Sequence, residues 1–399
     1  FQPASRVDFA VQALIDVGEI YNAIDLLEES LSVIPNNNQH RRMVVGFWAE
    51  LQRLEMIPPH LEQLIRNRTF DIPLLTGVTE TSVRRFSTRT ASKLIQRSPN
   101  DYRVQLGKAF ELLEQHDAVA AGKVLEQILE HHPDFAPAHA MYGQALIEQG
   151  QGDAIGTWLE QAPEGSDRYA DYWLTLGDAA TVDRHFAAAT NAYYQAVQRE
   201  LCNATALTRL IRSIRTLKSL ESEYADAVSD QQLDAIELRL DNVLKFRRHY
   251  DEFETSNKKS QRFATEVARS LLTIGRTWEA EAWSAVATTL QEDPASNLPS
   301  LRKEILNVLR QDQNWITQST LEPLDIDVQQ FPSPSIPGGP LQAEQQRITP
   351  KIASTTHLHM TDESDAWGLG QAGANNKPDD AQLAPLIRST AAGGGVIDY

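Results

Sequence analysis

Hydrophobic positions over most of the chain recur with the spacing of amphipathic helices, and short turns with glycine or proline separate the helical stretches. Residues 4–37 and 102–135 each predict a helix, a short turn and a second helix. A small residue lies five positions after each turn, Ala23 in the first stretch and Ala121 in the second. Small side chains at these positions allow two antiparallel helices to approach closely.

The helix pairs recur with a regular period. Pro99 and Pro133, each at the end of an amphipathic run, lie 34 residues apart. The clearest copy spans 170–203 and carries W-x-x-L-G followed by A-x-x-x-Y-x-x-A, at Trp173, Leu176, Gly177, Ala189, Tyr193 and Ala196. This pattern resembles the tetratricopeptide repeat, whose period is about 34 residues. Ala180 and Leu201 depart from it, where the family pattern has tyrosine and proline.

The resemblance implies an all-α fold, a right-handed superhelical solenoid of antiparallel helix pairs over residues 1–317. The recognisable repeats lie near 4–37, 102–135, 136–165, 170–203 and 261–294, and the second helix of the third is short because Pro163 comes early. An irregular helical bundle is the alternative.

Two stretches are degenerate repeats, 39–98 and 203–258. In the second, Ser229 with Gln232 three residues later predicts a capping box at the start of a helix. In the first, residues 70–80 contain Pro73 and a glycine and predict a loop that interrupts the array.

In such a solenoid the outward positions of the first helices line a groove that binds a protein or peptide. The resemblance places these positions at Arg103, Leu106, Phe110, Leu113, Asp171, Leu174, Asp178 and Thr181. The alternative is that each of these side chains is simply exposed.

Composition and charge argue against several classes of partner. The formal net charge of −17 argues against nucleic-acid partners and against docking on anionic lipid. No run approaches the roughly 18 apolar residues that a membrane span needs. The single cysteine, Cys202, cannot form an intrachain disulfide and predicts a small buried residue.

No catalytic pattern stands out in the helical part, so we expect no enzyme activity there. The histidines lack metal-ligand spacing, and neither G-x-S-x-G nor a phosphate-cradling loop occurs. His131 and His132 are adjacent and predict a helix C-terminus rather than a metal site.

After the helical part the composition changes. Residues 318–350 are rich in proline and predict an extended linker, or an arm packed over a neighbouring element. Residues 351–399 are rich in glycine and polar residues, with a strand indicated around His357 and His359. These two histidines form a solvated or hydrogen-bonded pair more readily than a metal site.

This last segment resembles the start of the FG-GAP/VCBS β-propellers that accompany the ASPIC/UnbV domain. The residues that carry the resemblance are Asp362, Ser364, Trp367, Gly368 and Leu369, and then "GGGVIDY". The resemblance implies that 351–399 is a fragment of a β-propeller domain and that Asp398 is the first ligand of a calcium loop, which one residue cannot form alone. A disordered acidic tail is the alternative.

The sequence therefore predicts an interaction or scaffold module that binds a peptide or protein, within a larger protein with a calcium-binding propeller. The propeller resemblance implies a bacterial protein in the periplasm or cell envelope. One alternative is the targeting or scaffold region of a multidomain enzyme, whose catalytic domain follows residue 399. Another is a structural subunit whose groove is filled by its own proline-rich arm.

Overall fold

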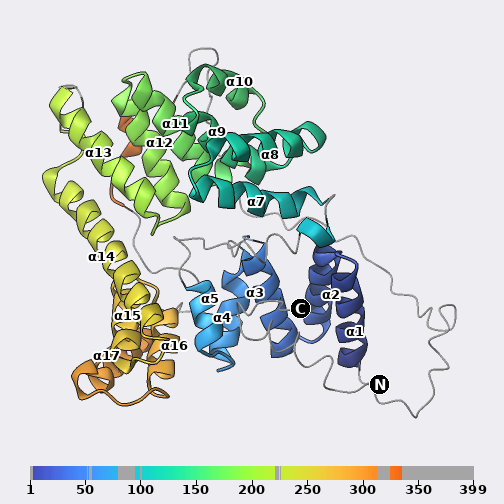
Figure 1. Cartoon of the computed structure of the whole chain (residues 1–399). Helices are drawn as coiled ribbons and strands as arrows, with labels where there is room; N and C mark the ends of the chain where they lie inside the picture. Colours follow the sequence, from blue (N-terminus) through green and yellow to red (C-terminus); the bar gives the residue numbers. More distant parts are fainter. Residues whose placement is uncertain are drawn as a thin grey trace, which may run out of the picture.

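The fold is a succession of antiparallel α-helix pairs (Figure 1). A computed structural model describes residues 3–51, 53, 56–79, 95–98, 101–220, 224, 226–311 and 324–334. Over these residues the prediction of an all-helical fold is confirmed, and the succession of helix pairs is consistent with a tetratricopeptide-like solenoid. The predictions for residues 335–399, including those for His357, His359 and Asp398, lie outside the described residues.

The central helices form the upper lobe of Figure 1. In chain order they are α7 (Tyr102–Glu114), α8 (Ala118–His131), α9 (Ala136–Glu148), η2 (Gly152–Ala154), α10 (Ile155–Glu160), η3 (Ser166–Arg168), α11 (Ala170–Val182), α12 (Phe186–Arg199) and α13 (Ala204–Leu220). Helix α10 has only 6 residues, as the early proline in this repeat predicts. His131 is the last residue of α8 and His132 its C-cap, as expected.

The N-terminal helices lie below α7 in Figure 1. They are α1 (Pro3–Asp16), α2 (Ile20–Val33), α3 (Asn38–Glu50), α4 (Pro58–Arg66) and α5 (Ile72–Val78). The prediction of a loop over 70–80 is wrong, because α5 occupies most of it. The Asp71 carboxylate accepts a hydrogen bond from the Leu74 backbone N–H, and proline is tolerated in the first helical turn.

The long helix α14 (Asp230–Thr255) connects the upper lobe to α15 (Gln261–Thr273), α16 (Thr277–Ala287), η5 (Pro294–Ser296) and α17 (Leu298–Gln311). The predicted capping box of Ser229 and Gln232 is confirmed at its start. The first half of α14 packs against α13, where Arg215 pairs with Glu237 at 2.8 Å. The second half packs against α15, where His249 Nδ1 lies 2.8 Å from Ser270 Oγ.

The array closes on itself, because α4 and α5 pack against α16 (Figure 1), and Tyr250 of α14 donates a hydrogen bond to the Thr76 carbonyl of α5. The Trp283 indole donates a hydrogen bond to Thr79 Oγ1 at 2.9 Å. Arg276 donates to the Thr79 carbonyl at 2.7 Å, and Arg68 pairs with Glu281 at 2.5 Å. A simple solenoid has contacts only between neighbouring repeats. Here two parts about 200 residues apart in sequence also share an interface.

The described part of the proline-rich stretch, residues 324–334, lies against α12 and α14. It contains η6 (Val328–Gln330), and we call it the strap. The strap does not fill the face formed by the first helices of the pairs.

Candidate partner-binding face

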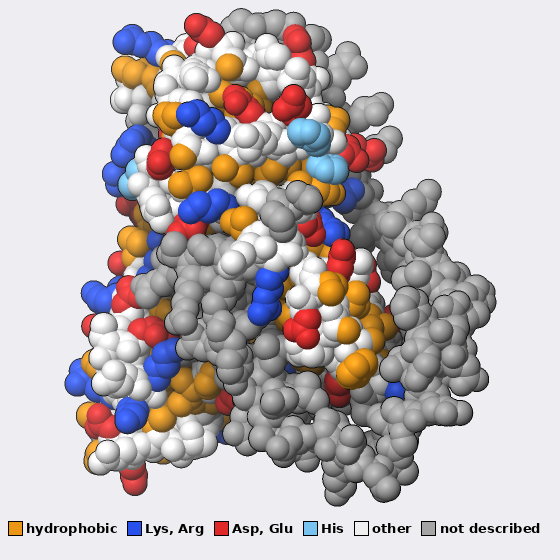
Figure 2. Space-filling model, turned by 45° about the vertical axis from the view of Figure 1, so that its right-hand side comes forward, with side chains coloured by type: hydrophobic (Ala, Val, Ile, Leu, Met, Phe, Trp, Pro, Cys, Tyr) orange, Lys and Arg blue, Asp and Glu red, His pale blue; other side chains and the backbone are white. Residues whose placement is uncertain are grey.

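The first helices of successive pairs, α7, α9, α11 and α13, are neighbours and form one face of the upper lobe, here called the first-helix face (Figure 1). The second helices, α8, α10 and α12, pack against α7, α9 and α11 respectively. On the side seen in Figure 2, basic side chains are interspersed with acidic ones.

Asp178 lies at the centre of a polar cluster that joins three first helices. The Tyr193 hydroxyl donates a hydrogen bond to Asp178 Oδ1 at 2.8 Å, and Arg209 Nη1 lies 2.6 Å from Oδ2. Arg209 also donates to Gln144 Oε1 at 3.3 Å. Gln144 Nε2 donates to Thr175 Oγ1 at 2.7 Å. The cluster thus links α9, α11 and α13.

Two carboxyl groups of this face, the half-buried Asp178 and the exposed Glu148, have raised pKa values. Burial raises the pKa of Asp178, against the opposing effect of Arg209. Burial also raises the pKa of Glu148, while His116 and Arg209 oppose the shift. Keeping both carboxylates charged here costs free energy. A partner that supplies hydrogen-bond donors would offset this cost.

The glycine of the repeat motif positions the cluster. A Cβ atom on Gly177 would lie 2.3 Å from Tyr193 Cε1, so only glycine lets the Tyr193 ring lie across α11. The Tyr193 hydroxyl then reaches Asp178 and lies 3.0 Å from Thr181 Oγ1. The W-x-x-L-G and A-x-x-x-Y positions therefore build the site as well as the fold.

Of the predicted groove residues on α11, Asp171, Asp178 and Thr181 lie half-buried on the first-helix face. The Asp171 carbonyl accepts a hydrogen bond from Thr175 Oγ1 at 2.9 Å, which connects it to the same cluster. The structure thus brings these three residues together.

The predicted residues on α7 lie apart from this cluster, because α9 separates α7 from α11. Arg103 pairs with Asp101 at 2.9 Å, and its guanidinium carbon lies 3.7 Å from the Tyr21 ring centroid. It fastens α7 to α2. Phe110 and Leu113 are half-buried against the hydrophobic core between α7, α8 and α9.

Two predicted residues are not available to a partner. Leu106 is 5% exposed and Leu174 is 3% exposed, and both belong to hydrophobic clusters between helices. The prediction that they line a groove is wrong. Neighbouring first helices lie close enough to cover apolar side chains at these positions.

An open groove of about 580 Å³ lies beside the cluster, between α13 and the first half of α14. Arg212 is exposed there, and no ion pair involves it within the described residues. The groove is lined by Thr208, Ile211, Arg212, Arg215, Thr216, Ser219, Glu237, Leu240, Asp241 and Leu244.

Sequence reasoning missed this groove because 203–258 reads as degenerate repeat. A signal was present: Arg209, Arg212, Arg215 and Lys218 recur every three residues along α13. This spacing places basic side chains along one side of a helix. Arg209 contacts Asp178, and Arg212 lines the groove, so one helix joins the cluster to the groove.

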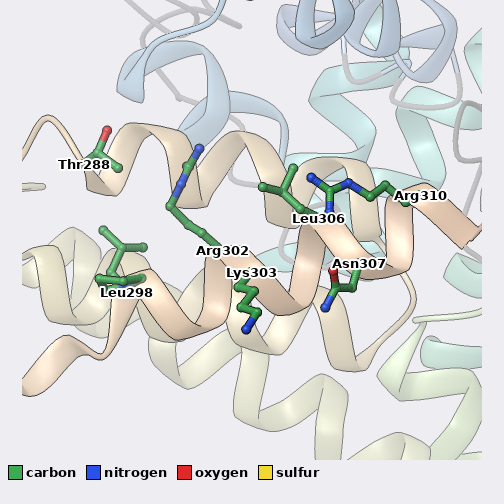
Figure 3. A pocket seen from close by; sticks show the side chains of 8 residues that line it. Thr288, Leu298, Arg302, Lys303, Leu306, Asn307 and Arg310 are labelled. Atoms are coloured by element: carbon green, nitrogen blue, oxygen red, sulfur yellow. The ribbon is translucent and has the colours of Figure 1, made fainter.

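A second concavity, of about 450 Å³, lies on α17, far along the chain from the cluster (Figure 3). Leu306 lies between Arg302 and Arg310 at four-residue spacing, with Lys303 beside them. Arg302 donates to Ser284 Oγ at 3.1 Å. The lining is basic and apolar, in contrast to the mixed charge of the α13/α14 groove.

Among the described residues, no group of three or more histidine, cysteine, aspartate or glutamate side chains could hold a metal ion. Asp398, the predicted first calcium ligand, lies outside them. In the same described part of the chain, no helix has the length and apolar character needed to cross a membrane.

Comparison with known proteins agrees with the geometry. A family model of the tetratricopeptide repeat matches residues 112–177, from the end of α7 into α11. The search of curated proteins gave no significant match. Over residues 112–177, which hold Gln144, Thr175 and Gly177, the chain is similar to the tetratricopeptide repeat family.

Proposed function

We propose that this chain is a protein-interaction module whose first-helix face binds a polypeptide segment of a partner. Tetratricopeptide repeats typically bind proteins or peptides, and an all-helical repeat fold is typical of a non-catalytic scaffold. The observation that carries the proposal is the continuity of the Asp178 cluster with the α13/α14 groove through α13.

The side chains indicate how such a segment would bind. Arg212 offers guanidinium donors to carboxylates or carbonyl oxygens of the partner. Leu240 and Leu244 offer apolar surface in the same groove. At the cluster, partner N–H groups would find the carboxylates of Asp178 and Glu148. A peptide with mixed polar and apolar side chains fits this arrangement.

A peptide library displayed on phage and panned against the purified chain tests the proposal. Enriched peptides are synthesised and titrated against the chain and its Arg212→Glu and Asp178→Asn variants. We expect each variant to weaken binding about tenfold, the loss of one charged contact. Lys123→Glu, an exposed change on the second helix α8, is the control and should leave binding unchanged. Peptides that bind all four proteins equally would refute the site.

We also propose, from the resemblance of residues 362–399, that the full-length protein joins this array to a calcium-binding β-propeller outside the bacterial cytoplasm. Calcium titration of the full-length protein, followed by calorimetry, tests this. Asp398→Asn should weaken calcium binding, and an unchanged calcium affinity would refute the role of Asp398. Fractionation of the source cells would locate the protein.

A further inference from the structure

The strap lies between the second helix α12 and α14, in what we call the α12/α14 groove, and forms hydrogen bonds to both helices. Its side chains alternate in exposure. Leu324, Ile326 and Phe331 are 6%, 7% and 4% exposed, while Asp325 and Asp327 are exposed. The apolar side chains join the same hydrophobic cluster as α12, α13 and α14.

The groove holds the strap by its backbone as well. The Tyr194 hydroxyl donates to the Leu324 carbonyl at 3.1 Å, and Gln232 Nε2 donates to the Asp325 carbonyl. Asn191 Nδ2 donates to the Phe331 and Pro332 carbonyls, at 3.4 Å and 3.2 Å. Carbonyl oxygens occur at every residue, so these donors recognise the main chain rather than particular side chains.

The buried side-chain amide of Asn191 is suited to binding a polypeptide backbone. Asn191 is 8% exposed, and both hydrogen bonds of its amide nitrogen go to the strap. A buried amide without a partner is costly, so the helix surface is built to receive a polypeptide. Phe331 supplies the apolar anchor and lies 5.9 Å from Tyr224, between ring centroids.

We propose that the α12/α14 groove is a peptide-binding site for segments of a partner protein that carry apolar residues at positions 1, 3 and 8 and form one helical turn at positions 5–7, as residues 328–330 of the strap do. In this structure the chain's own residues 324–332 occupy it. The partner segment binds when it displaces the strap. The α12/α14 groove is separate from the first-helix face, so this site is independent of the proposed function.

The covalent link between the strap and the rest of the chain determines how strongly the strap competes with a free peptide. A segment held in the same chain has an effective concentration on the order of 1 mM. If the free peptide binds with a Kd of about 10 µM, the intact chain should bind it about 100-fold more weakly than a chain whose strap has been released.

The test uses the full chain with a specific protease site inserted in residues 312–323. The probe is a fluorescein-labelled peptide of residues 321–335 at trace concentration, and its fluorescence anisotropy is followed as the chain is titrated to about 100 µM before cleavage, and after cleavage and removal of the released segment. We expect a Kd of about 10 µM only after cleavage. A peptide with Phe331→Ala should bind at least tenfold more weakly, and a peptide with Asp325→Asn, an exposed position, should bind equally well.

A second test uses the uncut chain with a weakened strap. Leu324→Ala with Phe331→Ala in the uncut chain weakens the strap and should raise the affinity for the wild-type peptide. Asn191→Ala should lower it in every form. The proposal is overturned if a scrambled peptide binds the cut chain equally well. It is also overturned if the cut chain loses its helical circular dichroism, because the strap is then an integral part of the fold.

Discussion

The closure of the array can be tested by replacing one hydroxyl group, that of Thr79, which accepts a hydrogen bond from Trp283. Thr79 and Trp283 are both fully buried, and the indole N–H donates to Thr79 Oγ1 at 2.9 Å. Thr79→Val replaces the hydroxyl by a methyl group of similar size. The indole N–H then stays buried without an acceptor, at a cost of about 1–3 kcal/mol.

Native-state hydrogen exchange is the assay, because it reports local opening region by region. A loss of about 1–3 kcal/mol corresponds to exchange about 5- to 150-fold faster in α4 and α5. Exchange of the amides of α9 and α11, which lie in the upper lobe, should change little. Thr79→Ser is the matched control, since it keeps the hydroxyl and loses only a methyl group.

The result that refutes this reasoning is also specific. If Thr79→Val leaves exchange in residues 56–79 unchanged, the hydrogen bond between Thr79 and Trp283 does not hold the N-terminal helices against α16. If Thr79→Ser accelerates exchange as much as Thr79→Val, the effect comes from packing and the hydrogen bond contributes little.

Three further predictions concern the first-helix face and α14. Gly177→Ala should displace the Tyr193 ring and destabilise the chain by about 1–2 kcal/mol, overpacking partly offset by better helix propensity, as measured by urea unfolding. Burial raises the folded-state pKa of Asp178 above its unfolded value, so the folded form binds the proton more tightly and the contribution of this carboxyl to stability falls as pH rises through that pKa. Asp178→Asn should remove this part of the pH dependence in thermal unfolding at several pH values, and an unchanged profile would contradict the assignment. Ser229→Ala should cost about 1 kcal/mol and speed exchange in the first turn of α14, whereas Ser229→Asp should restore slow exchange.

The local part of the fold could be predicted from the sequence. The helix pairs, the short second helix before Pro163 and the capping box at Ser229 each follow from residues a few positions apart. The wrong prediction of a loop over 70–80 also comes from residues a few positions apart. Pro73 and Gly77 read as a loop, but proline suits the first turn of a helix that Asp71 caps.

The contacts that close the array could not be predicted in this way. Thr79 and Trp283 lie far apart in sequence, and neither belongs to a repeat motif. The face was also predicted only in part. Position rules identified Asp178 and Thr181, but they placed Leu174 in a groove although neighbouring helices cover it. Burial by a neighbouring repeat depends on how closely two helices pack, which the pattern within one repeat does not determine.

The same helix connects the closure, the strap and the groove. The first half of α14 is held on α12 by the strap through Gln232, and its second half is held on α5 by Tyr250, which donates to the Thr76 carbonyl at 2.5 Å. Between these two attachments α14 forms one wall of the groove that contains Arg212. Within and beside the groove, the Arg215–Glu237 and Lys218–Asp230 ion pairs also join α13 to α14. The width of the α13/α14 groove is therefore set both by these ion pairs and by the two attachments of α14 outside it, and displacing the strap removes only one of these contacts.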